Sequence, residues 1–186
     1  PIFKISSGDN NYYQLINTVA HFGKPIIIST GITEINELQK VYKRIIKIFS
    51  YKKKIYRNLA FLHCVSNYPV PTDQVNLASI LYLKKKFPNI VIGYSDHTLG
   101  IEASVLSVVA GARIVEKHFT LDKNYSNFRD HQLSVNPKEM SILVKKIRKI
   151  EKMFGKEEKK IQICEKKMKI EARRSIAAAR NLSKGT

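Results

Sequence analysis

Two histidines stand just past two apolar, β-branched runs in the second half of the chain. His97 follows the run 90–92 after a short polar segment, and His118 follows the run 112–115 in the same way. Continuously apolar runs are typical of strands buried in a parallel sheet, and the carboxyl ends of parallel strands lie at one edge. A lone histidine there is usually only hydrogen-bonded. Two on neighbouring strand ends favour a shared divalent metal site.

The ends of the first two apolar runs carry groups suited to an anion. Lys4 and Ser7 could bind a phosphate or carboxylate, and Gly8 lets the backbone approach a ligand closely. The segment Ser29-Thr30-Gly31 offers two hydroxyls and a glycine at the end of the second run. An ordinary strand-to-helix turn explains either motif as well, so the pattern leaves both interpretations open.

Two later loops offer hydrogen-bonding side chains. Ser66, Asn67 and Tyr68 follow the third apolar run and could bind a polar ligand. Asp130 and His131 lie in a polar loop after the last run and could contact sugar hydroxyls. A solvated loop is the alternative interpretation of the second segment.

Other polar residues near the runs have structural interpretations. His63 and Cys64 lie inside the third run, so we expect both in the core. Asp96 either supports the histidine that follows it or acts as a general base. Glu116 is expected to be a buried partner of Lys117.

Five apolar runs, each followed by a helical pattern, predict five βα units. Thr33 is expected to cap the second helix, and Thr72 or Asp73 the third. Asn136 precedes a proline and opens a helix expected to stop at Gly155. The strands are expected at residues 2–6, 25–30, 59–65, 90–94 and 112–118.

Five units are too few for a closed eight-stranded βα barrel, which takes about 250 residues. Either three barrel strands are missing or the units complete an open doubly wound sheet. No GxGxxG or GxxxxGK[ST] motif supports the nucleotide-binding forms of that sheet. After Gly155 the sequence becomes charged and only weakly periodic, which predicts a domain boundary there. A new strand is predicted at Ser175–Ala179.

The net charge is +18, with 33 Lys and Arg against 15 Asp and Glu. A positive field favours an anionic substrate or a nucleic acid, so a basic nucleic-acid-binding module is a competing hypothesis. Thirteen of the basic residues fall between Lys145 and Arg174 together with five Glu, as on solvated helix faces. No nucleic-acid-binding motif accompanies the charge, so we expect no nucleic-acid partner.

The cysteines and the hydropathy pattern indicate a compartment. Cys64 and Cys164 are far apart, which argues against a disulfide framework or a thiolate zinc site and fits a reducing cytosol. No run approaches the ~18 apolar residues of a membrane span. We therefore expect a cytoplasmic protein with no membrane partner.

Six motifs, taken in order, resemble the N-acetylneuraminate (sialic acid) synthase family, which includes the legionaminic and pseudaminic acid synthases. The resemblance runs from Pro1 to about Gly155, with further similarity in 173–185. The motifs are KISSG from Lys4, KPIIISTG from Lys24, LHC from Leu62 with YPVP from Tyr68, SDHTLG from Ser95, EKHFTL from Glu116 and DHQLS from Asp130.

The resemblance implies an α/β fold in three parts. Residues 1–155 would be the C-terminal part, about strands four to eight, of a (β/α)8 TIM-barrel synthase domain. Residues 156–174 would be a linker, and 175–186 the start of a small antifreeze-like (SAF) domain. As an isolated piece, such a chain is expected to be poorly stable and inactive, because its sheet edges are unpaired and the early-strand residues are absent.

The resemblance also implies a reaction. Enzymes of the family condense phosphoenolpyruvate with an N-acetylated hexosamine to a nine-carbon keto acid and phosphate, use a divalent metal (Mn²⁺ or Mg²⁺) and form homodimers. The sugar would be N-acetylmannosamine or a 2,4-diacetamido-6-deoxy analogue, with the DHQLS motif favouring the legionaminic type. The alternative is another phosphoenolpyruvate-dependent keto-acid synthase or aldolase on a TIM barrel, acting on a phosphorylated sugar.

The resemblance further assigns roles to individual residues. Asp9 stands where many relatives have glutamate, and Ser66 where some have asparagine. Catalysis would fall to His97, His118, Tyr68 and Asp130. The contacts implied are metal ligation by His97 and His118, phosphoenolpyruvate binding by Lys4, Ser7 and Ser95, contact with both substrates by Tyr68, and substrate binding by Asp9, Ser66 and Asp130.

Overall fold

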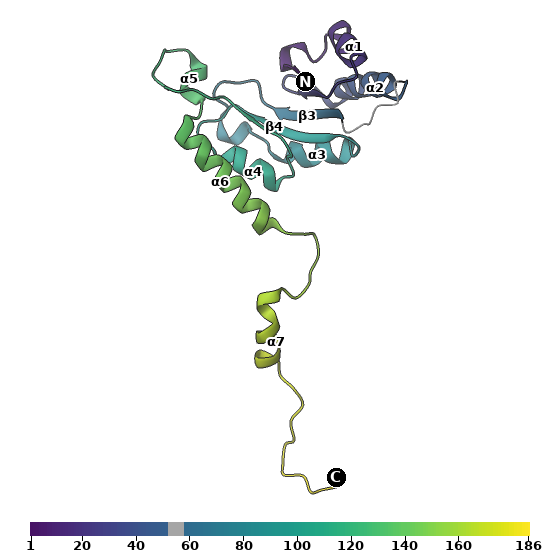
Figure 1. Ribbon diagram of the computed structural model, residues 1–186, viewed down its shortest axis with the longest axis vertical. Coiled ribbons are helices and arrows are strands. Elements are labelled where there is room, and N and C mark those ends of the chain that lie inside the picture. Colours follow the sequence, from purple (N-terminus) through teal and green to yellow (C-terminus); the bar gives the residue numbers. More distant parts are fainter. Residues whose placement is uncertain (52–57) are drawn as a thin grey trace. The chain divides into compact units, whose positions relative to one another are not determined.

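The computed structural model describes residues 1–51 and 58–186, which form two separate units, Pro1–Phe154 and Gly155–Thr186. Figure 1 shows the strands and the longer helices of the first unit. No helix in the described residues is long and apolar enough to cross a membrane.

The first unit is built on five parallel strands that pair in sequence order as a curled half-barrel (Figure 1). The predicted five-stranded parallel sheet is therefore confirmed. In such a sheet every strand points its carboxyl end to the same edge, where the polar motifs gather. The strands are β1 Phe3–Ile5, β2 Ile26–Ser29, β3 Leu59–Cys64, β4 Val91–Asp96 and β5 Val115–Lys117.

Alternation along each strand gives the sheet two different faces. One face carries large buried apolar side chains such as Ile28, Phe61 and Ile92, which belong to the main core. α2 contributes its buried side chains to the same core at helical spacing, with Leu38 and Val41 among them. The helices are α1 Tyr13–His21, α2 Ile35–Tyr51, α3 Ala78–Lys86, α4 Glu102–Val109, α5 Arg129–Leu133 and α6 Pro137–Phe154, with 3₁₀ turns η1 Ser7–Asp9 and η3 Thr72–Gln74.

Two predicted helix caps are wrong. α2 begins at Ile35, and Thr33 donates its hydroxyl to the carbonyl of Gly31 at 2.9 Å instead of capping the helix. The backbone N–H of Glu34 is bonded by the Glu37 carboxylate at 3.0 Å. Thr72 and Asp73 lie in η3, because the chain makes a separate 3₁₀ turn before α3 starts at Ala78.

The start of α6 matches its prediction. The Asn136 side chain accepts from the Glu139 N–H, and the Glu139 carboxylate accepts from the Asn136 N–H, both at 2.9 Å. This reciprocal capping box satisfies two backbone donors at the helix start. Gly155, with a φ of +64°, follows the helix as its predicted stop.

The second unit contains η4 Ile163–Glu165 and α7 Lys166–Ala172. The strand predicted at Ser175–Ala179 is wrong, because no described strand pairs with this segment. β-branched and small residues alone do not make a strand without a neighbour to complete its hydrogen bonds. The linker and the antifreeze-like domain stay predictions.

Candidate active site

The ends of β4 and β5 present alternate residues to opposite faces of the sheet. Ser95 pairs with Glu116 and Asp96 with Lys117 in the register of the two strands. Asp96 accepts a hydrogen bond from Ser104 of α4 at 2.5 Å, so its face is the one that α4 covers. We call this the outer face, and the face that carries Ser95 and Glu116 the inner face.

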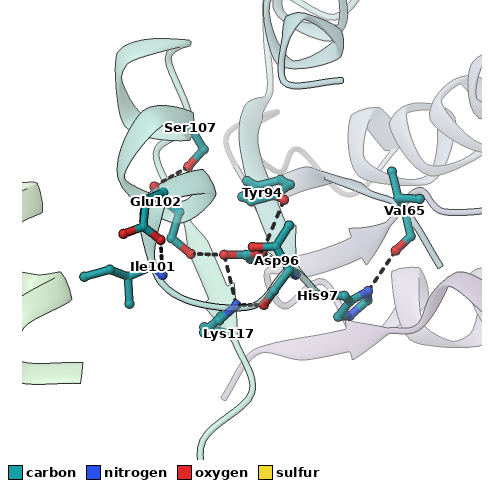
Figure 2. Close-up of polar contacts among 10 residues, drawn as sticks. Val65, Tyr94, Asp96, His97, Ile101, Glu102, Ser107 and Lys117 are labelled. Atoms are coloured by element: carbon teal, nitrogen blue, oxygen red, sulfur yellow. Dashed lines mark hydrogen bonds and ion pairs between the residues drawn. The ribbon is translucent and has the colours of Figure 1, made fainter. Parts of the chain in front are cut away.

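The two predicted metal ligands meet beyond the strand ends. The ring centroids of His97 and His118 lie 5.3 Å apart. Nδ1 of His97 lies 2.9 Å from the carbonyl oxygen of Val65, as Figure 2 shows. Because a carbonyl only accepts, Nδ1 is the donor in this contact, and Nε2 is the ring nitrogen that remains for a metal. A backbone carbonyl that orients an imidazole in this way is usual behind metal-binding histidines.

His118 is less buried and has a carboxylate beside it. Its side chain is about one-third exposed, and its Nδ1 lies 3.9 Å from Oδ2 of Asp130. Burial lowers the pKa of His118 below its ordinary value. The nearby Asp130 carboxylate acts in the opposite direction but raises the pKa by less. The neutral imidazole, the form that binds metals, is therefore favoured at physiological pH.

The pair of imidazoles fits part of a metal coordination shell. Within residues 1–51 and 58–186, no group of three or more His, Cys, Asp or Glu side chains stands ready to hold a metal ion. Catalytic metal sites commonly combine protein ligands with positions open to water or substrate. Nε2 of His97 and the favoured neutral form of His118 suit a cation there.

Tyr68 forms a wall of the site against both histidines. Its ring stacks on His97 with centroids 4.1 Å apart and meets His118 edge-on at 5.8 Å. The Arg129 guanidinium carbon lies 4.7 Å from the Tyr68 centroid. Arg129, Asp130 and His131 lie in helix α5 rather than in the predicted polar loop. Burial raises the pKa of Tyr68, so its phenol remains a hydrogen-bond donor at neutral pH.

Glu116 connects two residues predicted to bind the anionic substrate. Its Oε2 lies 3.1 Å from Nζ of Lys4, and its Oε1 accepts from the Ser95 hydroxyl at 2.6 Å. The predicted pairing of Glu116 with Lys117 is therefore wrong. Successive residues of a strand point to opposite faces, so neighbours on β5 cannot meet.

A second group of hydroxyls lies at the ends of β1 and β2. Ser7 accepts a hydrogen bond from the Gly31 N–H at 3.0 Å, and its hydroxyl lies 3.6 Å from the sulfur of Cys64. A Cβ on Gly31 would collide with the hydroxyls of Ser7 and Ser66, so the two serines flank this glycine. Among the described buried side chains, Ser29 Oγ is the one polar atom with no partner.

Sequence reasoning missed two residues that support this group. Asn10 is buried and donates to the carbonyls of Ser29 and Gly31 at 3.2 and 3.1 Å, which ties the loops after β1 and β2 together. Cys64 is buried as predicted, yet its sulfur also lies 3.9 Å from Nδ1 of His97. Neither role has a sequence signal, because both depend on which loops become neighbours.

The remaining candidates are less tightly placed. Asp9 is exposed and accepts the hydroxyl of Ser6 at 2.6 Å, within its own turn. His131 lies 2.9 Å from the Thr120 hydroxyl through Nδ1, while its neighbour Asp130 approaches His118. His63 is a core histidine as predicted, with Nε2 2.8 Å from the carbonyl of Val75. The roles proposed for Asp9 and Ser66 stay predictions.

The outer face behind the histidines holds a buried ion pair. Nζ of Lys117 lies 3.2 Å from Oδ2 of Asp96, and the two side chains are 1% and 0% exposed. Tyr94 adds a hydroxyl at 3.3 Å from Oδ1 of Asp96 (Figure 2). Burial lowers the pKa of Lys117, and the Asp96 carboxylate opposes that shift. Asp96 thus faces away from the inner face, which excludes it as a general base there.

Residues 1–159 match the NeuB family. The chain belongs to this family. It spans about half the length of the curated relatives it matches. It is 36% identical to human N-acetylneuraminate-9-phosphate synthase over 100% of this chain and 50% of the relative. It is 38% identical to N,N'-diacetyllegionaminic acid synthase of Campylobacter jejuni over 99% of this chain and 53% of the relative.

Two solved structures superimpose on this NeuB family chain. The N-acetylneuraminic acid synthetase of Leptospira borgpetersenii superimposes with a TM-score of 0.80 at 36% identity, covering 92% of this chain and 56% of the other. The Thermotoga maritima DAHP synthase superimposes with a TM-score of 0.67 at 14% identity, covering 83% and 46%. The second likeness concerns the fold alone.

Proposed function

We propose that this chain supplies part of the active site of a nonulosonic acid synthase. The enzyme would condense phosphoenolpyruvate with an N-acetylated hexosamine to a nine-carbon keto acid and release phosphate. The observation that carries the proposal is the convergence of His97, His118 and Tyr68 beside the Lys4–Glu116–Ser95 cluster on one face of the strand ends. Membership of the NeuB family supports the same reaction.

The β1–β2 end suits the anionic substrate. Lys4 supplies an ammonium group and Ser7 a hydroxyl, and Ser95 near the end of β4 adds a second hydroxyl from the inner face. An ammonium with two hydroxyl donors is a suitable set of partners for a phosphate or carboxylate. In this proposal these side chains fix phosphoenolpyruvate, whose reaction depends on orientation.

The β4–β5 end suits the sugar. His97 and His118 would hold a divalent cation, Mn²⁺ or Mg²⁺, which when bound supplies Lewis-acid polarisation of a carbonyl oxygen. Asp130, beside His118, would accept a hydrogen bond from a sugar hydroxyl. Tyr68 would exclude water from one side of the pair and offer its phenol O–H to either substrate.

The test measures phosphate release by the intact native polypeptide that carries this sequence. Phosphoenolpyruvate is offered with N-acetylmannosamine, with its 2,4-diacetamido-6-deoxy analogue or with N-acetylmannosamine 6-phosphate, each with Mn²⁺ or with EDTA. We expect release that requires one of these sugars, stops with EDTA and is lost in His97→Ala and His118→Ala. Release with none of them by a folded, metal-loaded protein would refute the proposal.

A further inference from the structure

His97 and His118 each follow one member of the buried ion pair on the outer face. Asp96 and Lys117 are the last matched residues in the register of β4 and β5. The residues that follow, His97 and His118, lie beyond this last pair and are not part of the strand register. The carbonyl of His118 instead accepts the N–H of Val135 at 2.9 Å. Strand pairing alone therefore does not set the separation of the imidazoles.

The Asp96 carboxylate holds the backbone on the far side of His97 as well. Its Oδ1 accepts the N–H and the hydroxyl of Thr98, both at 2.8 Å. Lys117 in turn donates to the carbonyl of Thr98 at 2.5 Å. In Figure 2 the side chains of Asp96 and Lys117 lie together on one side, and the His97 ring points the other way, toward Val65. Beyond the last ladder pair, Thr98 is thus held to Asp96 and Lys117 by their side chains.

A gain in stability does not by itself account for the burial of these two charges. Burying two charges costs about as much as their attraction returns, and an apolar pair of the same volume often serves a core equally well. What an ion pair adds is a defined contact geometry, because its partners must approach at a set distance and angle. Here that geometry fixes the two strand ends that carry the imidazoles.

We propose that the Asp96–Lys117 ion pair is a positioning device that sets the separation and orientation of His97 and His118 for metal binding. This inference rests on the proposed function, since it takes the two histidines as metal ligands. A purely structural ion pair would affect folding but leave the metal affinity of any folded variant unchanged. The two roles therefore separate in a metal-binding measurement.

The experiment titrates the intact native polypeptide with Co²⁺, followed by visible absorption, and with Mn²⁺. The decisive variant is Asp96→Asn with Lys117→Met, which removes both charges together and keeps similar volumes. Ser104→Ala is the matched control, because it removes one hydrogen bond to Asp96 but leaves the contact between the strands. Circular dichroism and a thermal melt establish that each variant is folded.

We expect the neutral pair to weaken Co²⁺ and Mn²⁺ binding by roughly 10- to 100-fold, the range for loss of groups that orient metal ligands. The Co²⁺ absorption bands should also shift, while the control stays within about 3-fold of the parent. Unchanged affinity and bands in a folded neutral pair would overturn the inference. If the neutral pair does not fold, Lys117→Arg decides: it keeps the charge but changes the length and shape of the contact, and an unaltered spectrum and affinity would again overturn it.

Failure of the proposed function gives a different result. If His97→Ala and His118→Ala bind metal like the parent, the two histidines are not ligands and the inference falls with them. If both histidines are required for Co²⁺ but no sugar supports phosphate release, the proposed reaction is wrong. The positioning role is then still decided by the neutral pair.

Discussion

The inner and outer faces of β4 and β5 carry polar residues at alternate positions of the same two strands, yet the two faces differ in how those residues are satisfied. On the outer face, Asp96 and Lys117 are almost wholly buried, and Asp96 accepts bonds from several donors. On the inner face, the paired Lys4 and Glu116 side chains are 36% and 42% exposed, and His118 is about one-third exposed.

The difference predicts that the proposed ligands bind on the inner face. A buried polar group with all its bonds made contributes rigidity and has nothing left to offer a substrate. A half-exposed group with spare lone pairs or protons can exchange water for a ligand. Substitutions on the outer face should therefore reduce stability, whereas substitutions on the inner face should reduce binding at little cost in stability.

The largest effect is expected from Lys117→Ala on the outer face. This change leaves the Asp96 carboxylate buried without its cation, and removal of one partner of a buried pair typically costs about 3–5 kcal/mol. Urea unfolding of the intact native polypeptide measures the loss. Ser104→Ala, which removes one hydrogen bond, should cost only about 1 kcal/mol. Equal losses in the two variants would contradict a special role for the charge.

On the inner face, His118→Gln should act on binding instead. We expect Mn²⁺ affinity to fall by more than about 100-fold, beyond the effect of losing an orienting partner, or about 2.7 kcal/mol of binding free energy. The free energy of unfolding should change by less than about 1 kcal/mol, because the side chain is partly exposed. Metal titration and urea unfolding of the same sample give both numbers. A large loss of stability would break the contrast between the faces.

His63, on the outer face, is expected to make the stability of the protein depend on pH. Burial lowers its pKa below the ordinary value, so near and below pH ~6.5 the unfolded chain takes up a proton that the native protein resists. Stability should therefore rise with pH through this window, by up to about 1.4 kcal/mol per pH unit from this group. Urea unfolding at a series of pH values should show a shallower dependence in His63→Gln. An unchanged pH dependence would contradict the prediction.

The smallest effect is expected at Glu139, which belongs to neither face. Its hydrogen bond with Lys123, followed by the Asn136 N–H, lowers the pKa of Glu139, so its contribution is present above pH ~4.5 and is lost on acidification. Glu139→Gln should cost about 0.5–1 kcal/mol near neutral pH, as for other helix caps. Thermal melts of the parent and the variant at neutral and acidic pH measure this loss of stability. The difference between parent and variant should shrink at low pH.

Sequence patterns were sufficient for the sheet but not for the contacts across it. Long β-branched runs such as Ile26–Ile28 predict buried strands directly, and the strand-end histidines follow from those strands. The partner of Lys117 requires the register, which aligns it with Asp96 on another strand. Strict alternation along β5 could already have excluded Glu116 as its partner.

Local capping signals were reliable only where the sequence was unambiguous. Asn136 with Glu139 three residues later is a complete capping box, and α6 begins there. Thr33 had no acidic residue at that spacing, and its hydroxyl bonds within its loop. Ser175–Ala179 contains one β-branched residue and three alanines, and no described strand pairs with it, so the local pattern was too weak to predict a strand.

The Glu116 carboxylate, which contacts both Lys4 and Ser95, is the counter-ion of the ammonium group that the proposed function assigns to the anionic substrate. If Lys4 binds phosphoenolpyruvate as proposed, the substrate has to displace or share that carboxylate, so the measured affinity would reflect an exchange rather than a simple association. Selectivity for a multiply charged substrate would then arise before any catalytic step, from the pair that it has to open.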